Sequence, residues 1–218
     1  MPAYSLTLID RHQWSNSAFE LTFSRPPDFD YVPGQRIRLV HHNVARDYSL
    51  ITIPRDPELA IYLRHIRTGV LTPVLVDLPC GADLHATGPL GYFNWHASSR
   101  PAVWVATGTG IAPFVAFARA GARPLAILHG AASLKEIHYQ AELSACTATY
   151  VPCLSAPRPA TGPALKIFPG RVTAYLAEHL PRAVYDFYLC GRGDMIREAT
   201  LLVDQHFPGS RVFSETFY

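Results

Sequence analysis

The sequence predicts two domains, an N-terminal antiparallel β-barrel over residues 1–98 and a C-terminal α/β domain with a parallel sheet over residues 99–218. Two observations predict this fold class. Before residue 99, short segments alternate between apolar and polar residues, which is the period of a half-buried strand. After residue 100, continuous apolar runs alternate with helix-like segments, as expected when helices join the parallel strands of a covered sheet.

The alternating segments of the first half are residues 18–24 (AFELTFS), 36–41 (RIRLVH) and 60–65 (AIYLRH). Proline and glycine residues separate them and favour turns. One short helix is expected from Thr72 onward, with Thr72 as its N-cap and Pro73 in its first turn. Because strands dominate this half, we expect a barrel.

The buried strands expected in the second half are residues 102–106, 125–129, 149–153, 186–190 and 211–213. Helices are expected near residues 111–120, 134–145, 171–179 and 194–206. The Pro/Gly-rich residues 155–170 are expected to form a long loop.

The composition excludes several classes of protein. With 49% hydrophobic and 17% charged residues, the 218-residue chain is globular, and its net charge of +2 does not favour nucleic-acid binding. Neither a secretory signal nor a membrane span is recognisable, so we expect a cytoplasmic monomer. The four cysteines form no CxxC pair and lack the plant-type ferredoxin spacing, so we expect free thiols, no cluster of that kind and no metal site.

Two segments have glycine-rich or polar patterns that suit phosphate binding. Residues 107–113 read TGTGIAP directly after an expected strand, a variant of the dinucleotide fingerprint with Pro113 in place of the third glycine. Taken alone, a tight glycine turn without a ligand is an equally good interpretation. Residues 69–75 (GVLTPVL) could receive phosphate at a helix N-terminus or be a plain capped helix.

Residues 46–51 (RDYSLI) combine a phosphate-binding side chain, Arg46, with a flat ring, Tyr48, and a small hydroxyl, Ser49. In isolation an ordinary strand is the better interpretation. Residues 190–195 (CGRGDM) follow an expected strand at the sheet edge where ligands bind. The chain ends in FSETFY, which by itself would pass for a frayed terminus.

Taken in order, these segments resemble the ferredoxin-NADP reductase superfamily, and most of all its short bacterial ferredoxin or flavodoxin reductases. YVPGQ at 31–35 and GPLGYF at 88–93 also fit, so the resemblance covers nearly the whole chain. It implies an FAD-binding barrel and an NAD(P)-binding domain. It further implies an enzyme that transfers hydride from NAD(P)H to FAD and then single electrons to a ferredoxin, flavodoxin or oxygenase component.

The resemblance also assigns roles to individual residues. It places Cys190 near the nicotinamide ring, Glu215 near the reactive nitrogen of the flavin, and Phe217 or Tyr218 over the flavin ring. The implied catalytic residues are Ser49, Cys190, Glu215 and Tyr218. The implied cofactor-binding residues are Arg46, Tyr48, Ser49, His65, Ile66, Val70, Leu71, Thr72, Thr107, Gly108, Thr109, Gly110, Ile111, Ala112, Arg171, Gly191, Met195, Phe217 and Tyr218.

The sequence departs from the NADP-specific relatives at two of three positions where they carry arginine. Ala132 and Ala156 occupy these two positions, whereas Arg171 keeps the third, with Arg158 as a substitute of uncertain alignment. Since no acidic residue for the ribose is evident, the sequence favours NADH only weakly.

Two other functions stay open at this point. The chain could be an electron-transfer subunit or flavin-binding module that is active only inside a larger complex. It could also be an NAD-dependent dehydrogenase without flavin, although the RDYS and GVLTP segments argue against this.

Overall fold

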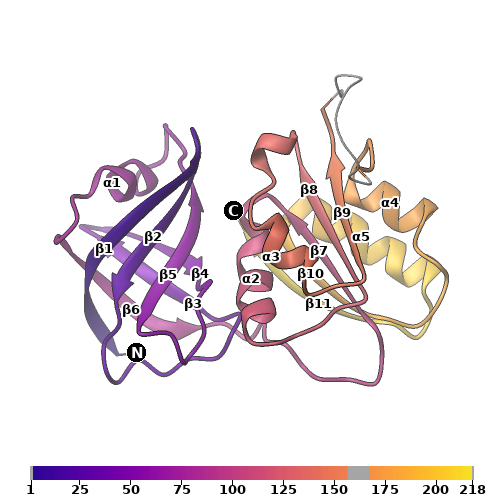
Figure 1. The fold of residues 1–218 in the computed structure, drawn as a ribbon, viewed down its shortest axis with the longest axis horizontal. Coiled ribbons are helices and arrows are strands. Elements are labelled where there is room, and N and C mark those ends of the chain that lie inside the picture. The colour runs from indigo at the N-terminus through magenta and orange to yellow at the C-terminus, as the bar shows by residue number, and fades with distance from the viewer. Residues whose placement is uncertain (1, 157–166, 218) are drawn as a thin grey trace. The chain divides into compact units, whose positions relative to one another are not determined.

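The computed structural model describes residues 2–156 and 167–217. The chain forms two compact units, one of residues 1–95 with 112–120 and one of residues 96–111 with 121–218. Figure 1 shows the strands of the first unit in indigo to magenta and those of the second in pink to yellow.

The first unit is an antiparallel barrel of six strands. Its order is β4-β3-β6-β1-β2-β5, and an antiparallel bridge between Leu50 and Ile61 joins the two end strands. The Ile51 N–H also donates to the Ala60 carbonyl at 2.9 Å. The sheet therefore closes on itself, which confirms the expected barrel. The strands are β1 (Ala3–Ser15), β2 (Ala18–Ser24), β3 (Arg36–His41), β4 (Val44–Ser49), β5 (Glu58–Arg64) and β6 (Asp83–Leu90).

Helix α1 (Thr72–Asp77) begins where the sequence predicts, but its cap differs. Leu71 is the N-cap, so the expectation that Thr72 caps the helix is wrong. The Thr72 hydroxyl instead exchanges hydrogen bonds with the backbone of Ile66, accepting from its N–H at 3.0 Å and donating to its carbonyl at 3.1 Å. This contact closes the loop that precedes the helix.

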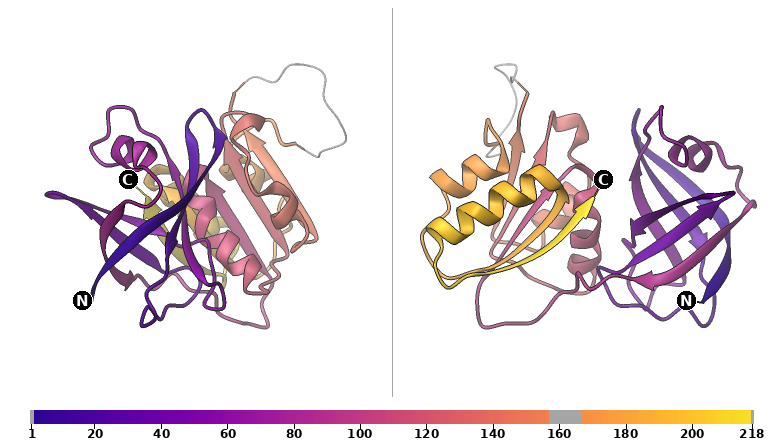
Figure 2. Two further views of the ribbon diagram at one scale, coloured as in Figure 1. Left: turned by 60° about the vertical axis from the view of Figure 1, so that its left-hand side comes forward. Right: turned by 180° about the vertical axis from the view of Figure 1, so that it is seen from behind.

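The second unit is a five-stranded parallel sheet of order β11-β10-β7-β8-β9. Helices α4 and α5 cover one face (Figure 2), where they pack on a core that includes Val105, Leu128 and Leu189. This arrangement confirms the expected α/β domain. Its strands are β7 (Ala102–Thr107), β8 (Ala126–Ala131), β9 (Thr149–Leu154), β10 (Asp186–Arg192) and β11 (Arg211–Phe217), and its helices are η1 (Gly108–Ile111), η2 (Leu134–Glu136), α3 (Gln140–Ser144), α4 (Val172–Glu178) and α5 (Gly193–His206).

Helix α2 (Ala112–Arg119) belongs to the first unit although it follows the first parallel strand. Phe114 and Phe117 pack against Phe93 with ring centroids 5.8 and 5.7 Å apart. The Arg119 guanidinium donates to the Ile51 carbonyl at 2.9 Å. The helix is therefore part of the hydrophobic packing of the barrel unit.

Two expected elements differ from the structure, and a third lies mostly outside the described residues. The helix expected at 134–145 is divided into η2 and α3, because Tyr139 adopts a left-handed conformation with φ of 58° that an α-helix cannot continue through. Strand β11 extends to Phe217 rather than ending at 213. Of the loop expected at 155–170, residues 157–166 lie outside the described residues. Within the described part of the chain, no helix is long and apolar enough to span a membrane.

Candidate functional site

Strand β4 presents the first group of predicted site residues. Its register with β3 pairs Arg46 with Leu39 and Tyr48 with Ile37, so alternation places Arg46 and Tyr48 on the same face. The next pair along, Arg38 and Asp47, forms a bidentate ion pair with bonds of 2.6 and 3.0 Å that fixes this register. A phosphate-binding side chain and a flat ring therefore lie side by side on one strand.

Arg46 and Tyr48 differ in exposure. Arg46 is exposed, and its guanidinium donates only locally, to the Ala45 carbonyl at 2.8 Å. Tyr48 packs partly into the barrel core. Burial raises the pKa of Tyr48 to about 12, against the opposing effect of Arg46, so the ring is neutral at physiological pH. Ser49 alternates to the opposite face and is 2% exposed.

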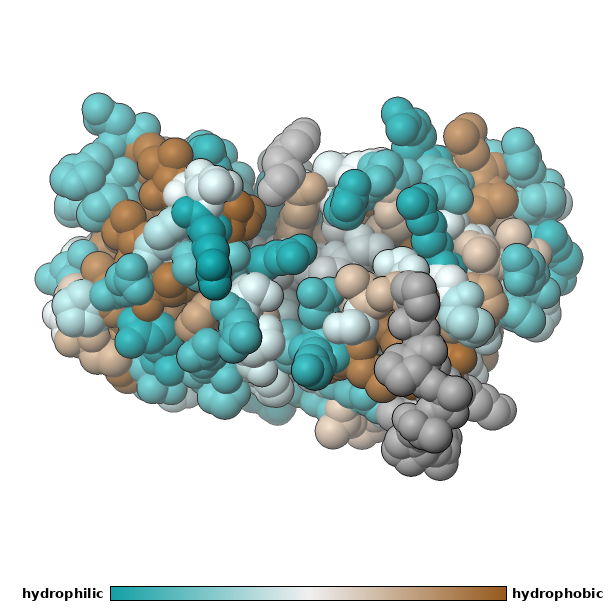
Figure 3. All heavy atoms as spheres, turned by 90° about the horizontal axis from the view of Figure 1, so that it is seen from above, coloured by the Kyte–Doolittle hydropathy of each residue, from teal (hydrophilic) through white to brown (hydrophobic). Residues whose placement is uncertain are grey.

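The loop between β5 and α1 carries the second group. Its two exposed aliphatic residues are Ile66, 48% exposed, and Val70, 64% exposed, whereas Leu71 is buried and anchors the loop in the core. The His65 ring lies edge-on to Phe19 at 6.1 Å. On the face shown in Figure 3, hydrophobic surface is exposed on the barrel between hydrophilic side chains. Such exposed aliphatics beside a helix N-terminus suit contact with an aromatic ligand that carries phosphates.

Glycines interlock the carboxyl ends of β7 and β10. A Cβ on Gly110 would lie 2.5 Å from the carbonyl carbon of Cys190 and 2.6 Å from the Cα of Gly191. Gly191 has a φ of 136°, and a Cβ there would lie 2.8 Å from the Thr107 carbonyl oxygen. The Arg192 N–H also donates to the Thr107 hydroxyl at 3.2 Å. Gly110 and Gly191 are therefore required by close packing against the backbone.

The turn itself begins as a 3-10 helix. Thr107 ends β7, and residues Gly108, Thr109, Gly110 and Ile111 form η1. Gly108 has a φ of 56°, and a Cβ there would meet no atom within 4 Å. Ala112, the last residue of the predicted nucleotide segment, starts α2 and belongs to the barrel unit.

The residues predicted around the nicotinamide meet at the same edge. Cys190 pairs with Glu215 in the parallel register of β10 and β11, and they are 0% and 8% exposed. Met195, 6% exposed, lies in the first turn of α5. Phe217 is the last residue of β11 and is half-buried, so residues 211–217 form a paired strand. Tyr218 lies outside the described residues.

The structure places two of the positions considered for a 2′-phosphate, Ala132 and Ala156, next to each other. The Ala156 N–H donates to the Ala132 carbonyl at 3.1 Å, so the two alanines that replace arginines are neighbours. The Arg171 side chain is 72% exposed and lies 3.9 Å from the Glu198 carboxylate. Arg158 is outside the described residues.

An acidic side chain that the sequence argument overlooked lies beside Ala132. One Glu136 carboxylate oxygen accepts the Ala132 N–H at 3.2 Å, at the carboxyl end of β8. Ser133 is the N-cap of η2 and Glu136 follows it by three residues. This Ser-x-x-Glu spacing is that of a capping box, which is the signal that could have located the residue.

Comparison with known proteins agrees with this geometry. A family model described as an oxidoreductase NAD-binding domain matches residues 104–200. A cytochrome P450 reductase of Amycolatopsis has a similar structure, with a TM-score of 0.84 and 26% identity over 99% of this chain and 70% of its own. A ferredoxin NADP+ reductase of Neisseria gonorrhoeae with bound FAD and NADP has a TM-score of 0.86 at 15% identity, and 99% of both chains is covered.

Two curated relatives are similar in sequence. The toluate 1,2-dioxygenase electron transfer component of Pseudomonas putida is 26% identical over 99% of this chain and 66% of its own length. Ferredoxin--NADP reductase B of Sorangium cellulosum is 34% identical over 58% of this chain and 57% of its own length. The chain thus spans less than two thirds of these relatives. The structure is an antiparallel barrel followed by a parallel-sheet domain, and the family model of an oxidoreductase NAD-binding domain falls mainly on the second of these. The chain is similar in sequence to proteins named ferredoxin–NADP reductases and oxygenase electron transfer components, and similar in fold to a ferredoxin NADP+ reductase.

Proposed function

We propose that the protein is an FAD-dependent reductase that takes hydride from NAD(P)H and passes electrons singly to a separate acceptor protein. The observation that carries this proposal is that Arg46 and Tyr48 lie on the same face of β4. The same chain also has a glycine turn packed against the end of β10. The first feature suits a flavin and the second a dinucleotide.

The barrel residues fit FAD. We assign Arg46 to its pyrophosphate and the neutral Tyr48 ring to its flat face, with His65 close to the ring. The Ser49 side chain is buried on the opposite face of β4, which argues against the direct flavin contact expected of it. The loop residues Ile66, Val70, Leu71 and Thr72 would contact the flavin and its phosphates. FAD, when bound, accepts a pair of electrons as hydride and releases them one at a time.

The residues of the parallel sheet fit the nicotinamide dinucleotide. Because Gly108 carries no side chain and its Cβ position has no atom within 4 Å, a ligand phosphate could approach the turn at residues 107–112 closely. Cys190 and Met195 would border the nicotinamide, and Glu215 would hold or exchange a proton at the flavin. Phe217 or Tyr218 would cover the ring until nicotinamide displaces it.

The visible absorption spectrum tests the proposal. The purified protein should be yellow, should release FAD on boiling, and should bleach when NADH is added under anaerobic conditions. Recovery of FMN alone would refute the cofactor assignment. A colourless protein that still oxidised NADH with a substrate would instead support a dehydrogenase without flavin.

We further propose a preference for NADH over NADPH. Two neighbouring alanines replace two arginines, and the Glu136 carboxylate beside Ala132 opposes a second negative charge. Ala132→Arg should improve kcat/KM for NADPH by about 10- to 150-fold, since a charged hydrogen bond is worth about 1.5 to 3 kcal/mol. Ala132→Gln, of similar length but uncharged, should not. A wild-type preference for NADPH would refute the assignment.

The acceptor is proposed to be a ferredoxin, a flavodoxin or an oxygenase component. Curated relatives are named as electron transfer components of a toluate dioxygenase and of a xylene/toluene monooxygenase. Within this proposal residues 1–98 bind FAD, residues 99–218 bind the nucleotide, and the protein acts as a cytoplasmic monomer. If it were active only as a subunit of a complex, the isolated chain would reduce its flavin with NADH but not turn over with added ferredoxin.

A further inference from the structure

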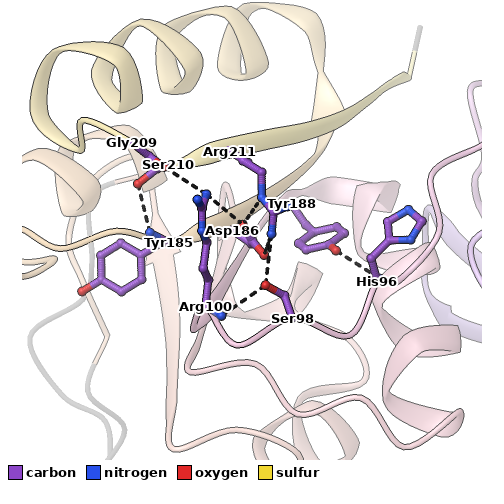
Figure 4. Close-up of polar contacts among 9 residues, drawn as sticks. All are labelled: His96, Ser98, Arg100, Tyr185, Asp186, Tyr188, Gly209, Ser210 and Arg211. Atoms are coloured by element: carbon purple, nitrogen blue, oxygen red, sulfur yellow. Dashed lines mark hydrogen bonds and ion pairs between the residues drawn. The ribbon is translucent and has the colours of Figure 1, made fainter.

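A buried carboxylate lies at the amino-terminal end of β10, four residues before Cys190 (Figure 4). The Asp186 side chain is 2% exposed, and its oxygens accept hydrogen bonds from Nε and Nη2 of Arg211, each at 2.8 Å. Burial raises the pKa of Asp186, but the hydrogen bonds from Arg211 and Ser98, together with the positive charges of Arg211 and Arg100, leave the pKa below its usual value. The pair is therefore ionised at neutral pH.

This ion pair joins the first residues of two neighbouring strands. Arg211 begins β11, which is an end strand of the sheet and pairs with β10. The register starts at Asp186 with Arg211 and reaches Cys190 with Glu215 four residues later. Between them, Phe213 stacks on Tyr188 with centroids 4.7 Å apart and planes inclined by 19°.

Apolar burial does little to fix the register of β11. Within Arg211–Phe217 the only buried side chain is that of Glu215, while Val212 and Phe213 are half-buried. A slip of one residue would move every side chain of the strand to the opposite face, and strands without a strong apolar face resist such slips poorly. The contacts of Arg211 and Phe213 must therefore supply much of the specificity.

We propose that the Asp186–Arg211 ion pair is a register clamp for β11, and that both are positioning residues for Glu215. The inference rests on the proposed function, in which Glu215 acts at the flavin. Arg211 lies ~13 Å along the strand from Glu215, so the clamp acts through the backbone and not by contact. The Arg211 side chain is 50% exposed, so the pair is only partly buried. Such ion pairs stabilise proteins weakly but can select one arrangement over others, which is the role assigned here.

The test uses the full chain loaded with FAD and the variant Arg211→Met, which keeps the aliphatic stem and removes the two hydrogen bonds to Asp186 and the one to Ser98. Amide hydrogen exchange in residues 213–217 should accelerate. The rate of flavin reduction by NADH in single turnover should fall ~10- to 100-fold, because small misplacements are costly. NADH affinity should stay within about threefold, since the nucleotide turn is untouched. Arg211→Lys should recover part of the rate and also serves if the Met variant does not fold.

Arg100→Met is the matched control. Its guanidinium is 3.9 Å from the same Asp186 carboxylate and donates to the Gly209 carbonyl, but Arg100 lies outside β11. Its reduction rate should equal that of the wild type. An equal slowing in both variants, or no slowing in Arg211→Met, would overturn the clamp. Failure of the proposed function would show separately, as a wild-type protein whose flavin NADH does not reduce, and amide exchange would still decide whether the clamp exists.

Discussion

Gly110→Ala should disrupt the turn at residues 107–112 far more than Gly108→Ala does. A methyl group on Gly110 would lie 2.5 Å from the Cys190 carbonyl carbon and 2.6 Å from the Gly191 Cα. Both are backbone atoms of a central strand, so neither can move aside as a flexible side chain could. Overpacking costs about 1 to 3 kcal/mol, and we expect about 3 kcal/mol here. Since 1 kcal/mol lowers Tm by about 2–4 °C for a chain of this size, Tm should fall by roughly 6–12 °C.

Gly108→Ala is the control within the same turn. A methyl group there meets no atom within 4 Å, so only the φ of 56° is penalised, at about 1 to 2 kcal/mol. Thermal unfolding measures both losses, and NADH titration of the folded proteins measures binding. Gly110→Ala should lose most nucleotide affinity while retaining bound FAD, because the barrel core does not include the turn. Equal Tm values for the two variants would refute the packing argument.

Three further predictions concern other parts of the chain. Burial, with a smaller effect of His138, lowers the pKa of His129 to about 3. Because an unfolded histidine has a pKa near 6.5, protonation favours the unfolded state as the pH falls below that value, and the free energy of unfolding decreases. In urea unfolding, the wild type should therefore lose about 2 kcal/mol more stability between pH 7 and 5 than His129→Gln. Arg46→Ala should weaken FAD binding by about 10- to 150-fold in a fluorescence titration. Arg55, an exposed arginine outside β4 that donates to the Arg119 carbonyl, is the control, and Arg55→Ala should leave FAD binding unchanged. Phe217→Ala should alter the single-turnover reduction rate by roughly 2- to 10-fold, and an unchanged rate would remove the ring from the flavin.

The sequence predicted the strands best where their periodicity was strong. Residues 18–24 and 36–41 match β2 and β3 in full. Strand β1 went undetected because its second half, including Asp10 and His12, is an exposed polar run that is held by pairing with β2 rather than by burial. The N-cap at Thr72 failed for a different reason. A hydroxyl can bond to any nearby backbone group, and only the loop conformation selects Ile66.

In the candidate site, too, the sequence predicted features that depend on neighbouring residues and missed those that depend on contacts between distant ones. The pattern TGTG indicated a turn that a phosphate could approach, and the structure does place it at the carboxyl edge of β7. What the pattern could not contain is that Gly110 packs on Cys190, eighty residues away along the chain. Glu136 was within reach of a local rule, since the Ser133-x-x-Glu136 spacing matches that of a capping box, although the Glu136 carboxylate accepts the Ala132 N–H and Ser133 makes no side-chain cap bond.

The packing of Gly110 and Gly191 couples the position of the turn after β7 to the position of the carboxyl ends of β10 and β11. Gly110 and Gly191 hold the turn after β7 against the end of β10, and the register of β10 with β11 then sets where Glu215 lies. Well-packed backbone has low compressibility and transmits displacement. A change that lifts the turn away from Cys190 would therefore move the β10 end and the paired Glu215 with it. Gly110→Ala should therefore lower both the nucleotide affinity and the hydride-transfer rate. Arg211→Met leaves the turn in place, so it should lower the rate and change the nucleotide affinity by no more than about threefold.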